Sequence, residues 1–176
     1  MTSKTRHLLT FAAIVALAAL APTASAADHG PVVRASGSLV DLQPASEGPF
    51  DGARARVQIV ASAQGSHALL QVKGVGPAAN GQSFGAHLHV GPCVAGNGAA
   101  AGPHYNTDVL AGVVPARVSD RTEVWLDVSV HDGAATSTAS VPFVPVAGAR
   151  SVVLHAMPTD AMGGAGARLA CLPVVW

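Results

Sequence analysis

Short segments of alternating polar and apolar residues recur along most of the chain. The clearest is ARARVQIVASA (residues 53–63), in which arginine and glutamine alternate with alanine, valine and isoleucine. Alternation with a period of two places each set of side chains on one face of a β-strand. The turn QGSH follows, and ALLQVKGV (residues 68–75) completes a predicted hairpin. Apolar residues at helical spacing are nearly absent after the first 26 residues.

Six further segments have strand character, so the sequence predicts eight strands in all. The others cover residues 32–42, 84–90, 123–130, 136–144, 150–156 and 168–175. We expect the strand at 123–130 to pair with that at 136–144 across the turn HDGA. Eight short strands separated by turns are typical of an all-β sandwich or barrel. Two long loops, residues 91–121 and 157–167, interrupt the spacing, and such loops commonly carry function.

Residues 1–26 have the features of a secretory signal peptide. A basic start precedes an apolar run (residues 8–21), and alanines at 24 and 26 fit a cleavage site. The run is shorter than the roughly 20 residues that a membrane span needs, and no later stretch is apolar enough to span. The alternative is an uncleaved anchor helix. We expect residues 27–176 to form one exported domain that is extracellular, cell-wall-associated or periplasmic.

Charge and cysteine content limit the partners and suggest one cross-link. Residues 27–176 carry eight basic and ten acidic side chains, a net charge of −2 with neutral histidines. With no basic run and no arginine-rich face in view, the sequence predicts no nucleic-acid partner. The two cysteines, Cys93 and Cys171, are expected to form one disulfide after export. The alternative is two separate buried thiols.

Three histidines lie within 18 residues, and a fourth ends a predicted strand. His87 and His89 occur in AHLHV, where a spacing of two puts both imidazoles on one strand face. They form either a metal-binding pair or two surface histidines. His104 follows a glycine-rich loop and is either a third ligand or a solvated loop residue. His155 closes SVVLH as a fourth ligand, or else as a capping or core histidine.

Four motifs together carry a resemblance to a known family. In order and spacing, GAHLHV, AAGPHYN, VVLHA and GGAGARLACL resemble the copper-zinc superoxide dismutases. The resemblance covers residues 32–175. It implies an eight-stranded, Greek-key, immunoglobulin-like β-sandwich with two functional loops. It also implies conversion of the superoxide anion to oxygen and hydrogen peroxide by alternate reduction and oxidation of copper.

The resemblance also implies roles for individual residues. Cys93 and Cys171 match the family disulfide, and Arg168 matches the arginine that attracts superoxide beside the copper. His104 would be both a ligand and a catalytic group. The residues that match the copper ligands are His87, His89, His104 and His155.

Departures from the family pattern point to its copper-only branch. The segment after His104 has no histidine until His131, so the family's zinc ligands are missing and we expect no zinc. The residues that could replace them have unsuitable spacing: Asp108, Asp120, Asp127 and His131. We expect Asp160 to accept a hydrogen bond from a copper-binding histidine.

The alternatives to a dismutase are an extracytoplasmic copper-storage protein and a sandwich with a decayed site. A monomer and a homodimer both fit.

Overall fold

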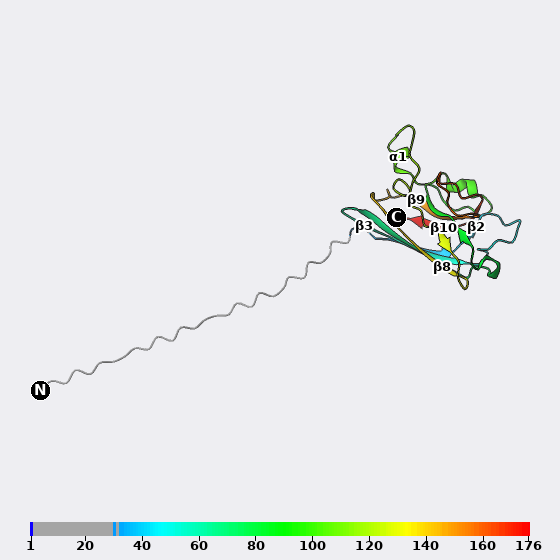
Figure 1. Ribbon diagram of the computed structural model, residues 1–176, viewed down its shortest axis with the longest axis horizontal. Helices are drawn as coiled ribbons and strands as arrows, with labels where there is room; N and C mark the ends of the chain where they lie inside the picture. Colours follow the sequence, from blue (N-terminus) through cyan, green and yellow to red (C-terminus); the bar gives the residue numbers. More distant parts are fainter. Residues whose placement is uncertain (2–29, 31) are drawn as a thin grey trace.

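Two four-stranded antiparallel sheets pack together in the computed structural model, which describes Met1, Gly30 and residues 32–176 (Figure 1). The first sheet has the order β1 (Val32–Ser38), β3 (Arg54–Ser62), β4 (Gly65–Lys73), β8 (Ala134–Val141). The second has the order β2 (Val40–Asp41), β10 (Arg168–Val175), β9 (Ala149–His155), β6 (Ala86–His89). A two-stranded ribbon joins β5 (Ser83–Phe84) to β7 (Val128–Ser129). Apart from Met1, the expected signal segment lies outside the described residues.

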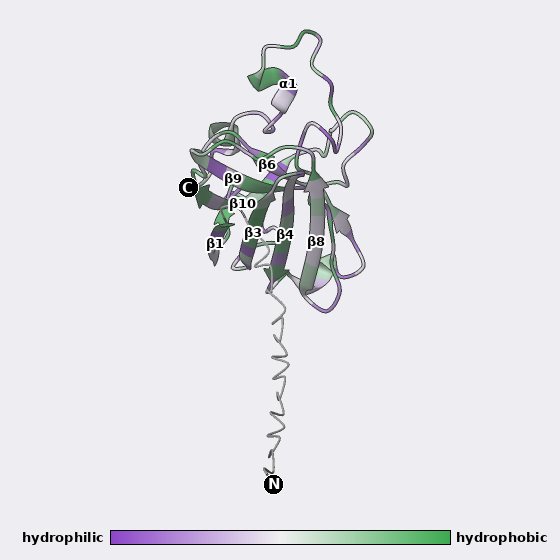
Figure 2. Ribbon diagram, turned by 90° about the vertical axis from the view of Figure 1, so that its left-hand side faces the viewer, coloured by the Kyte–Doolittle hydropathy of each residue, from purple (hydrophilic) through white to green (hydrophobic). Residues whose placement is uncertain are grey.

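Helical structure in the described residues is limited to three short segments. They are the 3-10 helices η1 (Pro77–Ala79) and η2 (Gly98–Ala101) and the helix α1 (Thr107–Leu110). None of these has the length and apolar character needed to cross a membrane. In Figure 2, α1 and the chain that follows it project beyond the sheets.

The predicted hairpin at residues 53–75 is confirmed as β3 and β4. These strands pair in continuous register from Arg54–Lys73 to Ser62–Gly65. The connecting turn is shorter than the predicted QGSH because Gly65 already belongs to β4. Gly65 has a φ of 132°, and a Cβ there would overlap the carbonyl oxygen of Val141. Only glycine fits this position, so the turn fixes where the hairpin begins.

The core lies between the facing sides of the two sheets. Alternate residues of β3, β4, β6, β9 and β10 point into it, as the period-two pattern predicts. Its most buried large side chains include Val57, Leu70, Leu88, Leu126, Leu154 and Leu172. Because the inner positions are apolar, the other positions of each strand are free to carry polar side chains on the outer faces.

The predominance of strands agrees with the all-β prediction, but four details differ. The sheets are not closed into a barrel, and the described part has ten strands, not eight. The predicted strand 32–42 divides at Leu39, where the chain passes from the first sheet to the second. The predicted strand 84–90 divides at Gly85, where the pairing partner changes from β7 to β9. A Cβ at Gly85 would lie 2.6 Å from that of Ala165, so this crossing needs glycine.

The predicted hairpin between residues 123–130 and 136–144 is wrong. A bridge between His131 and Ala134 forms the turn, but the arms then separate. β8 pairs with β4 along its whole length. Residues before β7 instead lie along β6, where Leu88 donates to the carbonyl of Val124 and Leu126 to that of Ala86. This detour brings residues 123–127 to the histidines.

Candidate metal centre

Strand β6 supplies His87 and His89 on its outer face. Its alternate residues Ala86 and Leu88 are buried in the core, as AHLHV predicts. Both histidine side chains are also inaccessible, at 0 % exposure, because loops cover the outer face. The two imidazoles therefore lie in a small enclosed space between sheet and loops.

Backbone pairing places His104 beside His89. The two residues form an antiparallel bridge, flanked by hydrogen bonds from Val90 to the carbonyl of Pro103 and from Tyr105 to that of Leu88. His104 is the most accessible of the four histidines, with 19 % of its side chain exposed. This side of the cluster is therefore the one that solvent and small solutes reach.

His155 arrives from the neighbouring strand. In the β6–β9 ladder, Val153 lies opposite His87 and Ser151 opposite His89, so His155 continues the same outer face. Its own partner in the β9–β10 ladder is Arg168. The four histidines thus come from two adjacent strands and one loop, and each offers a ring nitrogen within 4.8 Å of the others.

Hydrogen bonds fix which nitrogen of two rings faces the centre. His89 Nδ1 donates to the carbonyl of Gly102 at 3.0 Å, and His155 Nδ1 donates to that of Gly166 at 3.3 Å. A carbonyl can only accept, so the Nε2 atom of each neutral ring carries a lone pair. These two Nε2 atoms are 3.3 Å apart. A cation bound between such lone pairs would stabilise the arrangement.

His87 is held in the opposite tautomer by a short relay. Thr159 donates its hydroxyl proton to Asp127 Oδ1 at 2.5 Å and accepts from His87 Nε2 at 2.6 Å. Asp127 also accepts from the backbone of Thr159 at 2.8 Å. The lone pair of His87 is therefore on Nδ1, which is buried and has no hydrogen-bond partner among the described residues. Burying an acceptor without a hydrogen-bond partner costs free energy, so a metal ion is a suitable partner for this atom.

Glu123 fixes the ring of His104. Its Oε2 accepts from His104 Nδ1 at 2.8 Å and from Trp125 Nε1 at 2.8 Å, and its Oε1 accepts from Asn106 Nδ2 at 2.9 Å. Burial would raise the pKa of Glu123, but these three hydrogen bonds outweigh it and lower the pKa. The carboxylate therefore stays ionised and leaves Nε2 of His104 as the free ring nitrogen.

The buried histidines are neutral at physiological pH. Burial is the main cause that lowers the pKa of His87 to about 2, with repulsion from His104, His155 and His89 adding to it. Burial likewise lowers the pKa of His89 to about 3 and that of His155 to about 4. Neutral imidazoles with lone pairs directed at one point are the form that binds transition metals.

The metal-free protein is expected to lose stability as the pH falls below about 6.5. In the unfolded chain His87, His89 and His155 take up protons near that pH. In the folded protein they take up protons only near their lowered pKa values. Since the unfolded state binds more protons in between, the free energy of unfolding falls by on the order of 1 kcal/mol per pH unit for each histidine. Urea unfolding of the metal-free protein at several pH values measures this slope. A His67→Gln control, changed at an exposed histidine, should keep it, and a flat profile would contradict the burial of neutral imidazoles.

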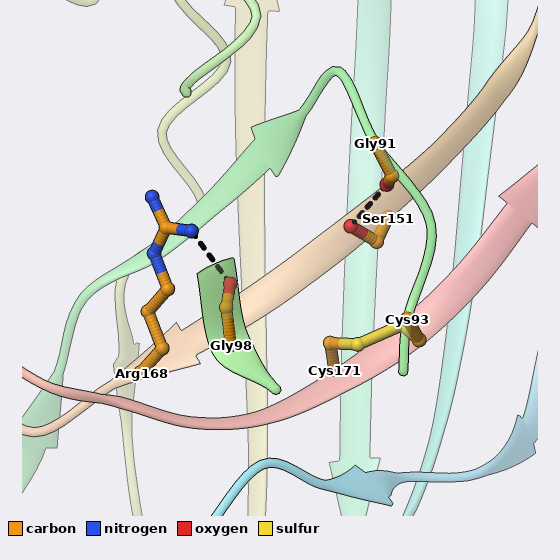
Figure 3. Close-up of a disulfide and its surroundings, with 6 residues drawn as sticks. All are labelled: Gly91, Cys93, Gly98, Ser151, Arg168 and Cys171. Carbon is orange, nitrogen blue, oxygen red and sulfur yellow. Dashed lines mark hydrogen bonds between the residues drawn. A yellow bond between two sulfur atoms is a disulfide. The ribbon is translucent and has the colours of Figure 1, made fainter. Parts of the chain in front are cut away.

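Three contacts attach the loop before His104 to the second sheet (Figure 3). The Cys93–Cys171 disulfide is present, as predicted, with a Cα–Cα distance of 5.9 Å. Ser151 Oγ donates to the carbonyl of Gly91 at 2.8 Å, and Arg168 donates to that of Gly98 at 2.6 Å. The loop therefore has little freedom to carry His104 away from the cluster.

Arg168 lies beside the cluster, whereas Asp160 does not contact it. The partly exposed Arg168 lies opposite His155 in the β9–β10 ladder, and its positive charge helps to lower the pKa of His89 and His155. The expectation for Asp160 is wrong. Its carboxylate accepts from the backbone of Met162 and Gly164 and shapes an exposed turn. Asp127, acting through Thr159, occupies the supporting role instead.

The sequence did not reveal the supporting roles of Glu123, Asp127 and Thr159, although Asp127 was considered as a zinc ligand. The segment EVWLDV did contain a signal, because Glu123, Trp125 and Asp127 alternate with residues that prove to be core. This alternation puts both carboxylates on one face of an extended segment. Nothing in the sequence indicated that this face contacts the histidines. Asp108, considered as a metal ligand, instead binds Arg117, whose Nε lies 2.7 Å from its Oδ2.

Comparison with known proteins adds no relative. No model of a known protein family matches the chain, and no curated protein matches it at a significant level.

Proposed function

We propose that the four histidines bind copper and that the protein disproportionates superoxide, as the copper-only branch of the copper-zinc superoxide dismutases does. Two superoxide anions and two protons would give one oxygen and one hydrogen peroxide. The observation that carries the proposal is the buried Nδ1 of His87, which has no hydrogen-bond partner among the described residues. It belongs to a cluster of four histidines that each offer a ring nitrogen within 4.8 Å of the others. An all-imidazole set of neutral ligands suits Cu(II), which also exceeds other divalent metals in affinity.

When bound, copper would supply one-electron transfer in both directions. The chain's own residues would do the rest. Arg168 would hold positive charge beside the site and attract the anion. His104, which is the most accessible ligand, would hold a proton at Nε2 when that atom does not bind copper. Glu123 would keep the other nitrogen of the same ring occupied throughout.

The contact between Glu123 and His104 also supports a single-metal site. In the resembled family, the matching histidine bridges copper and zinc through its two ring nitrogens. Here Nδ1 of His104 already donates to a carboxylate at 2.8 Å. We therefore propose that no zinc binds beside His104.

The finer features of the family complete the proposal. We infer a Greek-key, immunoglobulin-like connection of the strands, with residues 1–26 as a cleaved signal peptide and export as the destination. A disulfide is compatible with an oxidising compartment.

Copper storage by the same histidines is the second candidate. It is favoured by the near-complete burial of His87, His89 and His155, which leaves little metal surface for a substrate. Arg168 favours catalysis, because a neighbouring cation opposes storage of a positive ion.

Removing Arg168 tests the proposal. Copper-loaded protein is expected to hold one copper per chain and to remove superoxide faster than the same amount of free copper. Arg168→Ala should keep its copper but lose roughly tenfold in kcat/KM, with a weaker dependence on ionic strength. Pulse radiolysis with metal analysis measures both quantities. Arg121→Ala, which removes an exposed arginine elsewhere, is the matched control. Full copper occupancy without activity would favour storage, and an unchanged rate in Arg168→Ala would refute the attraction by Arg168.

A further inference from the structure

The outer face of the first sheet carries a group of cations far from the metal centre. Their side chains are exposed and come from β1, β3 and β4, which face the viewer in Figure 2. We call this group the basic face, and its members are Arg34, Arg54, Arg56 and Lys73. It holds half of the eight basic residues in 27–176. The expectation that the chain has no arginine-rich face is therefore wrong, because strand pairing gathers cations that are dispersed in the sequence.

No acidic side chain balances this charge within the sheet. The four strands β1, β3, β4 and β8 contain no aspartate or glutamate. Among the described residues, no ion pair involves a member of the basic face. The neighbours are neutral: Arg54 donates to Ser38 Oγ at 3.1 Å and Arg56 to Gln58 Oε1 at 3.3 Å.

The register places the cations in a continuous stripe. Arg54 lies directly opposite Lys73, Arg56 follows two residues along β3, and Arg34 is opposite Gln58. Adjacent strands are about 4.8 Å apart and same-face residues about 6.7 Å apart, so the Cα atoms of successive cationic residues lie roughly 5–8 Å from each other. Like charges directly opposite destabilise a sheet. A bound anion would relieve this repulsion.

A shallow hollow lies within the stripe. It is lined by Ser36, Gly37, Arg54, Ala55, Arg56, Gln71 and Lys73. Hydroxyl, amide and cationic donors therefore gather around this hollow.

We propose that the basic face binds a linear anionic polysaccharide. Regularly spaced cations suit sulfate, phosphate or carboxylate groups along such a chain. Serine, threonine and glutamine side chains between them suit its hydroxyls. The four strands contain no phenylalanine, tyrosine or tryptophan on which nucleic-acid bases could stack. The metal centre lies on the outer face of the other sheet, so a bound polymer would tether the protein without covering the metal centre.

Binding to soluble polymers tests this proposal without reference to metal or activity. Heparin, polygalacturonate and dextran phosphate supply sulfate, carboxylate and phosphate, respectively, on a polysaccharide chain. At low salt we expect at least one of them to bind, with affinity that falls as salt rises, and their ranking identifies the anionic group. The triple variant R54Q/R56Q/K73Q should bind roughly 100-fold more weakly, at about fivefold per lost charge. Isothermal titration calorimetry gives both the affinity and the salt dependence.

Three controls define which results would contradict the proposal. Arg121→Gln removes an exposed arginine outside the basic face and should bind the polymer as tightly as the wild type does. Each single substitution to glutamine within the basic face should bind more weakly than Arg121→Gln. Thermal unfolding should show no loss of stability in the triple variant, since its members are exposed. No binding to any polymer, equal binding by the triple variant, or tighter binding to single-stranded DNA or anionic vesicles would overturn the proposal.

Discussion

Glu123→Ala is expected to weaken copper binding by about 10- to 100-fold and to destabilise the metal-free protein. The carboxylate accepts hydrogen bonds from His104, Trp125 and Asn106, and only 4 % of its side chain is exposed. Its removal leaves three donors without an acceptor, which costs on the order of 3 kcal/mol or more. It also frees the ring of His104 to rotate away from the cluster.

The two effects are separable by measurement. Urea unfolding of the metal-free protein gives the free energy of unfolding, and competition with a chelator gives the copper affinity at a temperature where both proteins are folded. The only other glutamate, Glu47, is exposed, and Glu47→Ala is the matched control, with an expected change within about 0.5 kcal/mol. Unchanged copper affinity in folded Glu123→Ala would show that the carboxylate does not position His104.

Loss of the disulfide is expected to reduce stability by up to about 4.5 kcal/mol. The cysteines are 78 residues apart in sequence, so the cross-link removes much of the freedom of the unfolded chain. A Cys93→Ala/Cys171→Ala variant should unfold at lower urea and with a steeper dependence on urea, because its unfolded state is more expanded. Since Cys93 belongs to the loop before His104, copper affinity should fall as well.

Reduction of the wild type provides the control for this variant. Reduced wild-type protein should match the double variant, and adding reductant to the double variant should change nothing. A stability loss below about 1 kcal/mol in both would show that hydrogen bonds alone, such as that from Ser151 to Gly91, hold the loop in place.

Features that depend on local geometry were predictable from the sequence. The period of two in AHLHV fixes that His87 and His89 share a face, and the same rule places His155 on the outer side of its strand. The hairpin of β3 and β4 followed from two alternating segments close together in the chain. The order and spacing of the motifs then assigned His104 and the two cysteines to the same predicted copper-binding domain.

Features that depend on the pairing of distant segments were not predictable. The segment at 123–127 was expected in a hairpin with β8, but it lies along β6 and thereby brings Glu123 to His104 and Asp127 to Thr159. Asp160 appeared nearest in sequence to a ligand, yet its carboxylate is used by its own turn. Sequence proximity does not decide which carboxylate reaches a buried imidazole, because hydrogen bonds require contact in space.

The sequence by itself determined the strand-rich fold, the candidate ligand set and the cysteine pair. Only the tertiary structure decided which ring nitrogen of each histidine faces the centre, which acid supports it, and that Arg34, Arg54, Arg56 and Lys73 form one face. The physical reason is that side-chain direction along a strand is a local property of the backbone. Neighbours across strands and loops are instead set by the packing of the whole domain.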